Sequence, residues 1–339
     1  IRRPPRSTRK ESSAASDVYK RQVFVIVAYF GVGFYVYSQA VATTCSVYEP
    51  EANNTPDNFS LGEKASWDPS KYFVNSYEDV QIQTEDGIIL SGWYMESDPN
   101  AITIIGMHGV TSSKFSPDVL LVGGMLYKQG FNYLTFDYRD HGTSTCEDSR
   151  HSAGQKEIYD VKASIDWLKN EKNIPTSNIG IYGASFGAMI GLMTPAVTND
   201  FQALAVVDSP FDFASLVSEE LVYQGFPGFL FQPVYHYALI FDQINLTEIS
   251  PDDGLAASNK QPLLIFNGKQ SPRVLAHHTD DLIEAASKYG ISAEVNRYDD
   301  LSHTEVMYAY PVEFELKLVN FFRSNINAVS YTHLRAHET

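Results

Sequence analysis

The sequence predicts an α/β protein with a mostly parallel, eight-stranded sheet and helices on both of its faces. Two observations support this fold class. Short apolar segments alternate with amphipathic ones from about residue 70 to residue 328, and the helical period recurs at Val161, Ile165 and Leu168. Such alternation is typical of parallel sheets, because each helix that connects two strands covers one face of the sheet.

Eight short segments rich in apolar residues are expected to be strands. They are Val80–Gln83, Ile88–Tyr94, Ile102–Met107, Tyr133–Phe136, Ile179–Tyr182, Ala203–Val207, Leu263–Phe266 and Ala293–Tyr298. The first two are joined by Asp86-Gly87, a pair typical of hairpin turns, so the sheet should begin with an antiparallel edge.

Five segments are expected to be the main helices. They are Pro117–Gln129, Gln155–Lys169, Phe186–Ala196, Val274–Lys288 and Glu313–Arg323. In the second of them, Asp160, Asp166 and Lys169 are expected to lie together on the polar side. A further segment, residues 211–259, is too long for a loop between the sixth and seventh strands, so we expect a small helical lid there.

Residues 23–41 contain no charged side chain, and a helix of that length rises roughly 28 Å, about the hydrocarbon thickness of a bilayer. We expect a transmembrane anchor, with a cleaved signal sequence or a buried core helix as alternatives. Residues 42–69 are then a tether, and residues 70–328 the main domain. No Lys or Arg follows the anchor before Lys64, so the positive-inside rule places that domain on the periplasmic or extracellular side.

Residues 1–22 and 329–339 lack periodicity and resemble translated sequencing-adapter read-through, so we set them apart from the fold. For the first of them, a disordered basic tail is the alternative. The net charge of −16 includes +5 from residues 1–22, which leaves −21 on the remainder. So acidic a chain argues against nucleic acid as a partner, and against attraction to anionic lipid.

The two cysteines, Cys45 and Cys146, do not lie in a CxxC motif, so neither a zinc site nor a redox site is expected. They could pair in an exported domain, but the sequence leaves the pairing open.

The motif Gly183-Ala184-Ser185-Phe186-Gly187 fits G-x-S-x-G and lies between a predicted strand and a predicted helix. A serine on so sharp a turn is strained and has an exposed hydroxyl, and the small residues beside it leave room for the turn. We therefore expect Ser185 to be a nucleophile. The alternative is an ordinary turn between two core elements.

Two backbone N–H groups, those of Val110 and Phe186, are expected to form an oxyanion hole. Phe186 follows the nucleophile, and Val110 follows His108-Gly109 at the end of the third strand. His108 itself is expected to be structural, and residues 137–142 are expected to form an internal polar network.

His303 follows the last predicted strand and stands downstream of Ser185, the chain order that nucleophile-elbow hydrolases require. We expect it to be the general base and then the general acid. Among the other histidines, His277 and His278 lie in a helical pattern, and His333 and His337 lie in the suspect tail.

These motifs together resemble the α/β-hydrolase superfamily, and within it the membrane-anchored branch that groups with serine aminopeptidase-like and Bem46-like hydrolases. The residues that carry the resemblance are His108-Gly109, Asp137-Tyr138-Arg139 with His141-Gly142, Gly183-x-Ser185-x-Gly187, Asp208-Ser209-Pro210-Phe211 and His303. The superfamily spans esterases, lipases, thioesterases and peptidases, so the resemblance implies the fold more than the substrate.

One position departs from the family pattern. The triad acid usually stands three residues after the glycine that ends strand seven, and here that position holds Ser271. Serine cannot supply the negative charge that stabilises imidazolium. Asp208, at the end of strand six, is the predicted acid; Asp299 or Asp300, or a weak or inactive site without an acid, are the alternatives.

The expected function is hydrolysis of a carboxylester or thioester through an acyl-enzyme, on a small-molecule or lipid-like substrate and without a metal or cofactor. Aromatic residues in the lid suggest an apolar acyl or aryl group, unless they only seal the lid to the core. One alternative is an aminopeptidase-like amidase in which Glu219 or Glu220 binds a substrate amine. The other is a hydrolase-fold binding protein.

Overall fold

The structure is a computed structural model that describes residues 6–326, with side chains from residue 16 onwards. Within the described residues the chain forms two compact units. One, the anchor–lid unit, comprises the chain up to Val41 together with Val217–Asn245. The other, the sheet unit, comprises Ala42–Leu216 and the chain from Leu246 onwards. Residues 1–5 and 329–339, both assigned above to adapter read-through, lie outside the described residues.

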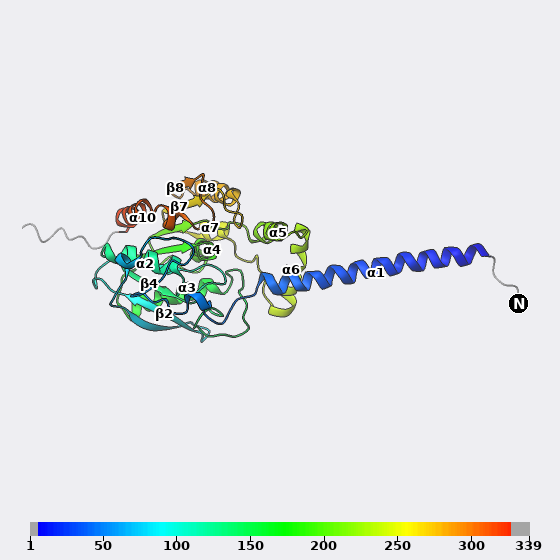
Figure 1. Cartoon of the computed structure of the whole chain (residues 1–339), viewed down its shortest axis with the longest axis horizontal. Helices are drawn as coiled ribbons and strands as arrows, with labels where there is room; N and C mark the ends of the chain where they lie inside the picture. Colours follow the sequence, from blue (N-terminus) through cyan, green and yellow to red (C-terminus); the bar gives the residue numbers. More distant parts are fainter. Residues whose placement is uncertain (1–5, 327–339) are drawn as a thin grey trace, which may run out of the picture. The chain divides into compact units, whose positions relative to one another are not determined.

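The sheet unit contains an eight-stranded sheet (Figure 1). Its strands follow the order β1-β2-β4-β3-β5-β6-β7-β8. The strands are β1 (Glu78–Gln83), β2 (Ile89–Met95), β3 (Thr103–Met107), β4 (Asn132–Phe136), β5 (Ile179–Ala184), β6 (Ala203–Val207), β7 (Leu263–Gly268) and β8 (Ala293–Tyr298). β1 pairs with β2, and β2 with β4, in antiparallel fashion, and all other pairs are parallel. The predicted fold class and its antiparallel edge are therefore confirmed.

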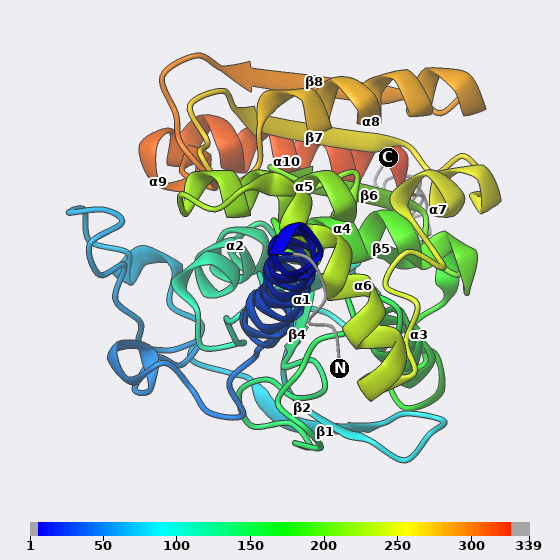
Figure 2. The same cartoon turned by 90° about the vertical axis from the view of Figure 1, so that its right-hand side faces the viewer.

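Helices cover both faces of the sheet, as Figure 2 shows for α8 and α10 on opposite sides of β7. The helices of the sheet unit are α2 (Pro117–Lys128), α3 (Glu157–Asn170), α4 (Phe186–Met193), α7 (Pro251–Ala257), α8 (Ala276–Tyr289), α9 (Val306–Ala309) and α10 (Pro311–Asn325). Short 3-10 turns are η1 (Glu49–Glu51), η2 (Ser70–Tyr72), η3 (Thr176–Asn178) and η4 (Thr194–Ala196). The predicted helix over residues 186–196 is thus α4 followed by η4.

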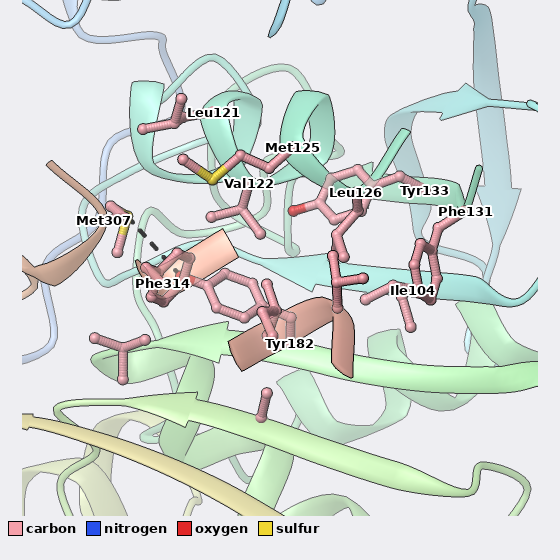
Figure 3. Packing of buried hydrophobic residues seen from close by; sticks show 14 of the residues in the cluster. Ile104, Leu121, Val122, Met125, Leu126, Phe131, Tyr133, Tyr182, Met307 and Phe314 are labelled. Carbon is pink, nitrogen blue, oxygen red and sulfur yellow. Dashed lines mark hydrogen bonds between the residues drawn. The ribbon is translucent and has the colours of Figure 1, made fainter. Parts of the chain in front are cut away.

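A cluster of buried apolar residues lies between the sheet and the pair α2 and α10 (Figure 3). Val122 and Met125 of α2 point towards Tyr182 of β5, and the Tyr182 ring meets that of Phe314 of α10 edge-on at 6.3 Å between centroids. Ile181, the neighbour of Tyr182, contacts the opposite helix α4 near Gly191. Successive side chains of β5 therefore serve the two faces in turn, which explains why this strand is apolar throughout.

Two expectations about polar segments need correction. Residues 42–69 do not form a solvated tether, because Phe59 and Leu61 are buried in the apolar cluster and the Asn54 amide donates to the Phe115 carbonyl at 3.0 Å. Asp160 does not lie on the polar side of α3. It is buried and binds the Arg139 guanidinium at 2.6 Å, because a buried arginine needs a carboxylate partner.

The expected network at residues 137–142 is present. The carboxylate of Asp137 accepts from the Lys114 backbone N–H at 2.6 Å and from the Lys114 ammonium at 3.1 Å. Asp140, at a positive φ of 59°, accepts from three successive N–H groups, those of Glu147, Asp148 and Ser149. These contacts fix the loops that follow β4.

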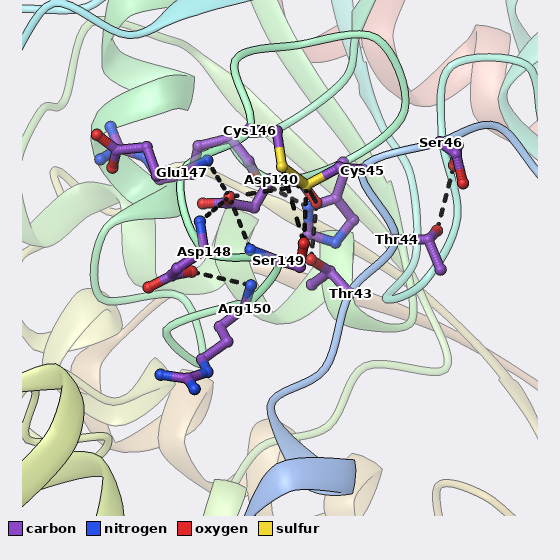
Figure 4. Close-up of a disulfide and its surroundings, with 12 residues drawn as sticks. Thr43, Thr44, Cys45, Ser46, Asp140, Cys146, Glu147, Asp148, Ser149 and Arg150 are labelled. Carbon is purple, nitrogen blue, oxygen red and sulfur yellow. Dashed lines mark hydrogen bonds between the residues drawn. A yellow bond between two sulfur atoms is a disulfide. The ribbon is translucent and has the colours of Figure 1, made fainter.

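Cys45 and Cys146 form a disulfide, the pairing that the sequence left open (Figure 4). The two residues are 101 positions apart, so the bond closes a long loop between the start of the sheet unit and the segment after β4. It holds the chain next to the turn organised by Asp140.

The anchor–lid unit contains α1 (Arg6–Ala40), most of α5 (Phe213–Tyr223), the 3-10 turn η5 (Gly228–Phe231), α6 (Gln232–Tyr237) and the π-helical turn η6 (Ala238–Asp242). Residues 6–22, set apart from the fold in the sequence analysis, belong to α1. Ser16–Ala40 of this helix is long and apolar enough to cross a membrane, a property that signal sequences share. α1 packs against η5 and α6 of the lid.

Replacing both cysteines (Cys45→Ser with Cys146→Ser) should lower the free energy of unfolding by about 2–5 kcal/mol, because the unfolded chain gains the entropy of an open loop. Urea unfolding under oxidising conditions measures this difference. Wild-type protein treated with a reductant should match the double variant. An unchanged unfolding midpoint in both would show that the bond does not stabilise the fold.

Candidate active site

Ser185 lies on a sharp turn between β5 and α4, with φ 54° and ψ −119°. A positive φ is strained for a residue with a side chain, and the surrounding structure must maintain it. The Ser185 N–H donates to the Val207 carbonyl of β6 at 2.9 Å, which ties the turn to the neighbouring strand. This is the conformation expected of a nucleophile elbow.

The two glycines of the motif are required by space. A Cβ on Gly187 would lie 2.6 Å from the Met107 carbonyl oxygen, and one on Gly183 would lie 2.5 Å from the backbone of Gly187. Either side chain would force β3, β5 or α4 apart. The spacing in G-x-S-x-G therefore follows from the close approach of α4 to the strands.

His303 lies on the loop between β8 and α9, and its Nε2 atom is 2.9 Å from the Ser185 hydroxyl oxygen. The two residues are 118 positions apart in the chain, and both side chains are only partly buried. At this distance the imidazole can accept the hydroxyl proton directly.

The other ring nitrogen, Nδ1, lies 3.2 Å from the hydroxyl oxygen of Ser271, on the loop after β7. That oxygen also accepts the Val274 N–H at 3.0 Å, which orients it. If Nε2 accepts the hydrogen bond from the Ser185 hydroxyl, Nδ1 carries the ring proton and donates a hydrogen bond to the Ser271 oxygen. Sequence reasoning treated Ser271 only as a missing acid. Its place at the family's acid position was the signal that it faces the imidazole.

Asp208 is buried at the end of β6, with a positive φ of 45°. One carboxylate oxygen accepts the Gly268 N–H at 2.8 Å and the Asn267 side-chain amide at 3.1 Å, and the other accepts the Thr304 N–H at 2.7 Å. Burial raises the pKa of Asp208 to about 6, although these donors favour the ionised form. Asp208 therefore binds the backbone of the His303 loop, and its role as the triad acid stays a prediction.

The other candidate acids bind elsewhere. The Asp299 carboxylate pairs with the Lys269 ammonium at 2.6 Å on the surface, and the Asp300 carboxylate accepts from the Tyr310 hydroxyl at 2.6 Å. These contacts direct both side chains into surface pairs.

The surroundings of the predicted oxyanion hole are consistent with its role. The Phe186 N–H is the first of α4, so it has no acceptor within its own helix. A Cβ on Gly109 would lie 3.8 Å from the Ser185 Cβ, which places the loop before Val110 beside the nucleophile. The assignment of these two N–H groups stays a prediction.

His108 fixes this loop from within the protein. Its Nε2 accepts the Tyr138 N–H at 3.3 Å, so Nδ1 carries the proton that reaches the Gly109 carbonyl at 2.8 Å. Burial lowers the pKa of His108 to about 3, so the ring is neutral. A neutral, doubly bonded histidine agrees with the structural role expected for it.

Comparison with known proteins gives the family. Residues 121–328, more than half of the chain, match the prolyl oligopeptidase family. The chain belongs to this family. Its α/β-hydrolase fold is shared with the Pyrococcus furiosus esterase Pf2001, at a TM-score of 0.63 and 23% identity over 85% of this chain and 99% of that chain. The Porphyromonas gingivalis dipeptidyl peptidase 4 matches at a TM-score of 0.56 and 19% identity, over 74% and 36% of the respective chains.

Two curated relatives are similar in sequence along most of this chain. The uncharacterized peptidase YuxL of Bacillus subtilis is 24% identical over 82% of this chain and 44% of its own length. The uncharacterized protein YfhR of Escherichia coli K12 is 24% identical over 81% of this chain and 86% of its own length. The chain thus spans less than half of YuxL. Family and fold together make it a hydrolase of the α/β-hydrolase superfamily, while the placement in the Bem46-like branch stays a prediction.

The raised pKa of Asp208 predicts a pH dependence of stability. Between about pH 4 and pH 6 the Asp208 carboxyl group is ionised in the unfolded chain and protonated in the native chain, so stability falls as the pH rises. The decrease is up to about 3 kcal/mol and is complete above the native pKa. Unfolding of Asp208→Asn by urea at several pH values should lack this component.

Asp299→Asn is the control for that measurement. Lys269 lowers the pKa of Asp299, so the Asp299 charge adds stability as the pH rises to about 4, and above that range the carboxylate is ionised in both states. The substitution should therefore leave the slope between about pH 4 and pH 6 close to that of wild type. Equal slopes in Asp208→Asn and wild type would contradict the raised pKa.

Proposed function

We propose that this protein is a serine hydrolase that cleaves a carboxylester or thioester through an acyl-enzyme. Ser185 attacks the substrate carbonyl while His303 takes its proton, and the N–H groups of Val110 and Phe186 stabilise the oxyanion. His303 then returns the proton to the leaving group. A water molecule, activated by the same histidine, releases the acid and frees Ser185. The distance of 2.9 Å between Ser185 Oγ and His303 Nε2 carries the proposal.

Ser271 and Asp208 share the work of the usual triad acid in this proposal. The Ser271 hydroxyl oxygen accepts a hydrogen bond from the Nδ1–H group of His303 and orients the ring. Asp208 supplies the negative charge, and its carboxylate binds the N–H of Thr304, the residue after His303. Asp208 acts through the Thr304 N–H, so it is a positioning residue rather than a catalytic one. Its charge is fully present only above about pH 6, so turnover should rise with pH through that range.

The preference for an apolar acyl group is supported by the composition of the lid. Residues 221–241 include seven Phe or Tyr residues and no Asp, Glu, Lys or Arg. A peptidase is the second candidate, because the family match and the name of YuxL, an uncharacterized peptidase, both point to peptide substrates. In that case Glu219 or Glu220 of α5 would bind the substrate amine.

We also propose that α1 anchors the protein in a membrane, with the sheet unit on the periplasmic or extracellular side. The apolar stretch Ser16–Ala40 supports anchoring, and the absence of Lys and Arg between Arg21 and Lys64 supports this orientation. The Cys45–Cys146 disulfide agrees with it, because such bonds persist in oxidising compartments.

A fluorophosphonate probe should label wild-type protein, and Ser185→Ala should abolish the labelling. His303→Ala should reduce the labelling rate by at least about a hundredfold, because the hydroxyl loses its base. Gel fluorescence after a timed reaction measures both effects. Labelling that persists in Ser185→Ala, or a folded wild-type protein that is never labelled, would overturn the proposal.

The bond class is tested by kcat/KM on matched p-nitrophenyl acyl esters and aminoacyl p-nitroanilides. The ester proposal requires a higher value for the esters, rising with acyl length. Preference for the anilides, lost in Glu219→Gln or Glu220→Gln, would favour the peptidase instead.

Ser271→Asp should restore a carboxylate at the family's acid position and raise kcat by about tenfold or more, because a negative charge beside Nδ1 stabilises the imidazolium. Ser271→Ala is the matched control, and it should lower kcat by removing the acceptor. Circular dichroism checks that both variants fold. A folded Ser271→Asp protein with lower kcat than wild type would show that the hydroxyl itself is required.

A further inference from the structure

We propose that the uncharged lid segment, Leu221–Phe241, is embedded in one leaflet of a lipid bilayer beside α1, so that lipid acyl chains are its partner. The proposal rests on the anchoring role proposed for α1.

The lid packs on α1 through aromatic and backbone contacts. The rings of Tyr29 and Phe229 stack at 6.3 Å between centroids, and the Tyr237 hydroxyl donates to the Phe30 carbonyl at 2.8 Å. A Cβ on Gly33 would lie 2.4 Å from Pro233, so this glycine lets α6 approach the helix closely. Small residues play this part where helices pack in membranes.

The contact continues towards the end of α1. Phe34 packs edge-on against the rings of Tyr237 and Phe241, at 5.5 and 5.8 Å between centroids. One turn further on, the Tyr37 ring stacks on Phe241 at 6.2 Å, and its hydroxyl donates to the Asp242 carboxylate. This polar pair lies near the end of the apolar span, where tyrosine is favoured at the membrane interface.

The position of these contacts along α1 sets the depth of the lid. The helix rises about 12 Å from Tyr29 to Tyr37, and Tyr29 lies about 18 Å along the helix from Val41. One leaflet of hydrocarbon is about 15 Å thick. A bilayer crossed by Ser16–Ala40 would therefore also enclose the lid residues that touch α1, and only in the leaflet on the side of the sheet unit.

The lid surface suits an apolar surrounding. Between Glu220 and Asp242 there is no Asp, Glu, Lys or Arg, in a chain with 41 acidic residues. Large apolar or aromatic side chains in this segment are nevertheless exposed, namely Val222, Tyr223, Phe226, Phe229, Leu239, Ile240 and Phe241. Soluble proteins rarely expose so many apolar side chains together, and such surfaces mark protein or membrane contacts.

The backbone of the lid is also compatible with lipid. Most of the segment is helical, and the turn between α5 and η5 pairs its N–H groups internally. Gln224, Gly225 and Phe226 donate to carbonyls of Glu220, Val222 and Leu221 at 2.8–3.0 Å. Pro227 and Pro233 have no N–H to satisfy. Backbone groups paired within the segment are what the hydrocarbon region demands.

The test uses the full-length protein in phosphatidylcholine vesicles, with an environment-sensitive NBD label on one introduced cysteine. The described cysteines form a disulfide, so a maleimide reagent reacts with the introduced thiol. The three sites are Ile240→Cys in the lid, Phe24→Cys in α1 and Val312→Cys in α10. Ile240 and Val312 are matched apolar residues, 67% and 69% exposed. Lipids with a nitroxide on the acyl chain and aqueous iodide are the two quenchers.

The proposal predicts that nitroxide lipid quenches the labels at positions 24 and 240 at least about threefold more strongly than the label at position 312, which iodide quenches instead. Quenching by lipid at position 24 but not at 240 would overturn the lid proposal and leave the anchor intact. In that case iodide quenching at 240 would indicate a lid in water, and protection from both quenchers would indicate a second protein chain. Absence of lipid quenching at position 24 would overturn the anchor and the lid proposal together.

Discussion

The geometry of the site depends on one buried carboxylate that joins three segments of chain. Asp208, at the end of β6, binds Gly268 at the end of β7 and Thr304 on the loop after β8. Ser271 stands three residues after Gly268, and His303, whose imidazole Ser271 faces, directly precedes Thr304. A carboxylate can hold several N–H donors in the interior because its charge strengthens each bond, and burial in turn raises its pKa. Loss of this contact would release both loops at once.

Backbone strain and close packing also position the residues of the site. Ser185, Asp208 and Thr304 all have positive φ. Ser185 and Asp208 stand where the chain leaves β5 and β6, and Thr304 lies in the loop between β8 and α9. The glycines at 183 and 187 allow α4 to approach β3 so closely that the strained serine is held in place. The packed strands thus maintain backbone conformations at the site that would be unfavourable in an isolated chain.

The lid belongs to the anchor–lid unit, but in the chain it lies between two strands that carry residues of the site. It is inserted in the chain between β6 and β7, the strands whose ends carry Asp208 and the Ser271 loop, and it packs on α1 within its own unit. The acidic remainder of the chain and the uncharged lid therefore suit different surroundings. This division agrees with a hydrolase that works at a membrane surface on apolar acyl substrates.

The sequence by itself determined the fold class and most element positions, because apolar periodicity and turn residues are local signals; β6 and β8 match their predicted bounds. It also identified Ser185 and His303 as candidates from motif and chain order. Only the tertiary structure decided that Ser271 faces the imidazole, that Asp208 binds backbone, that Asp160 is buried by Arg139, and that Cys45 pairs with Cys146. These are contacts between distant residues, and no local pattern specifies which partners meet across a folded sheet.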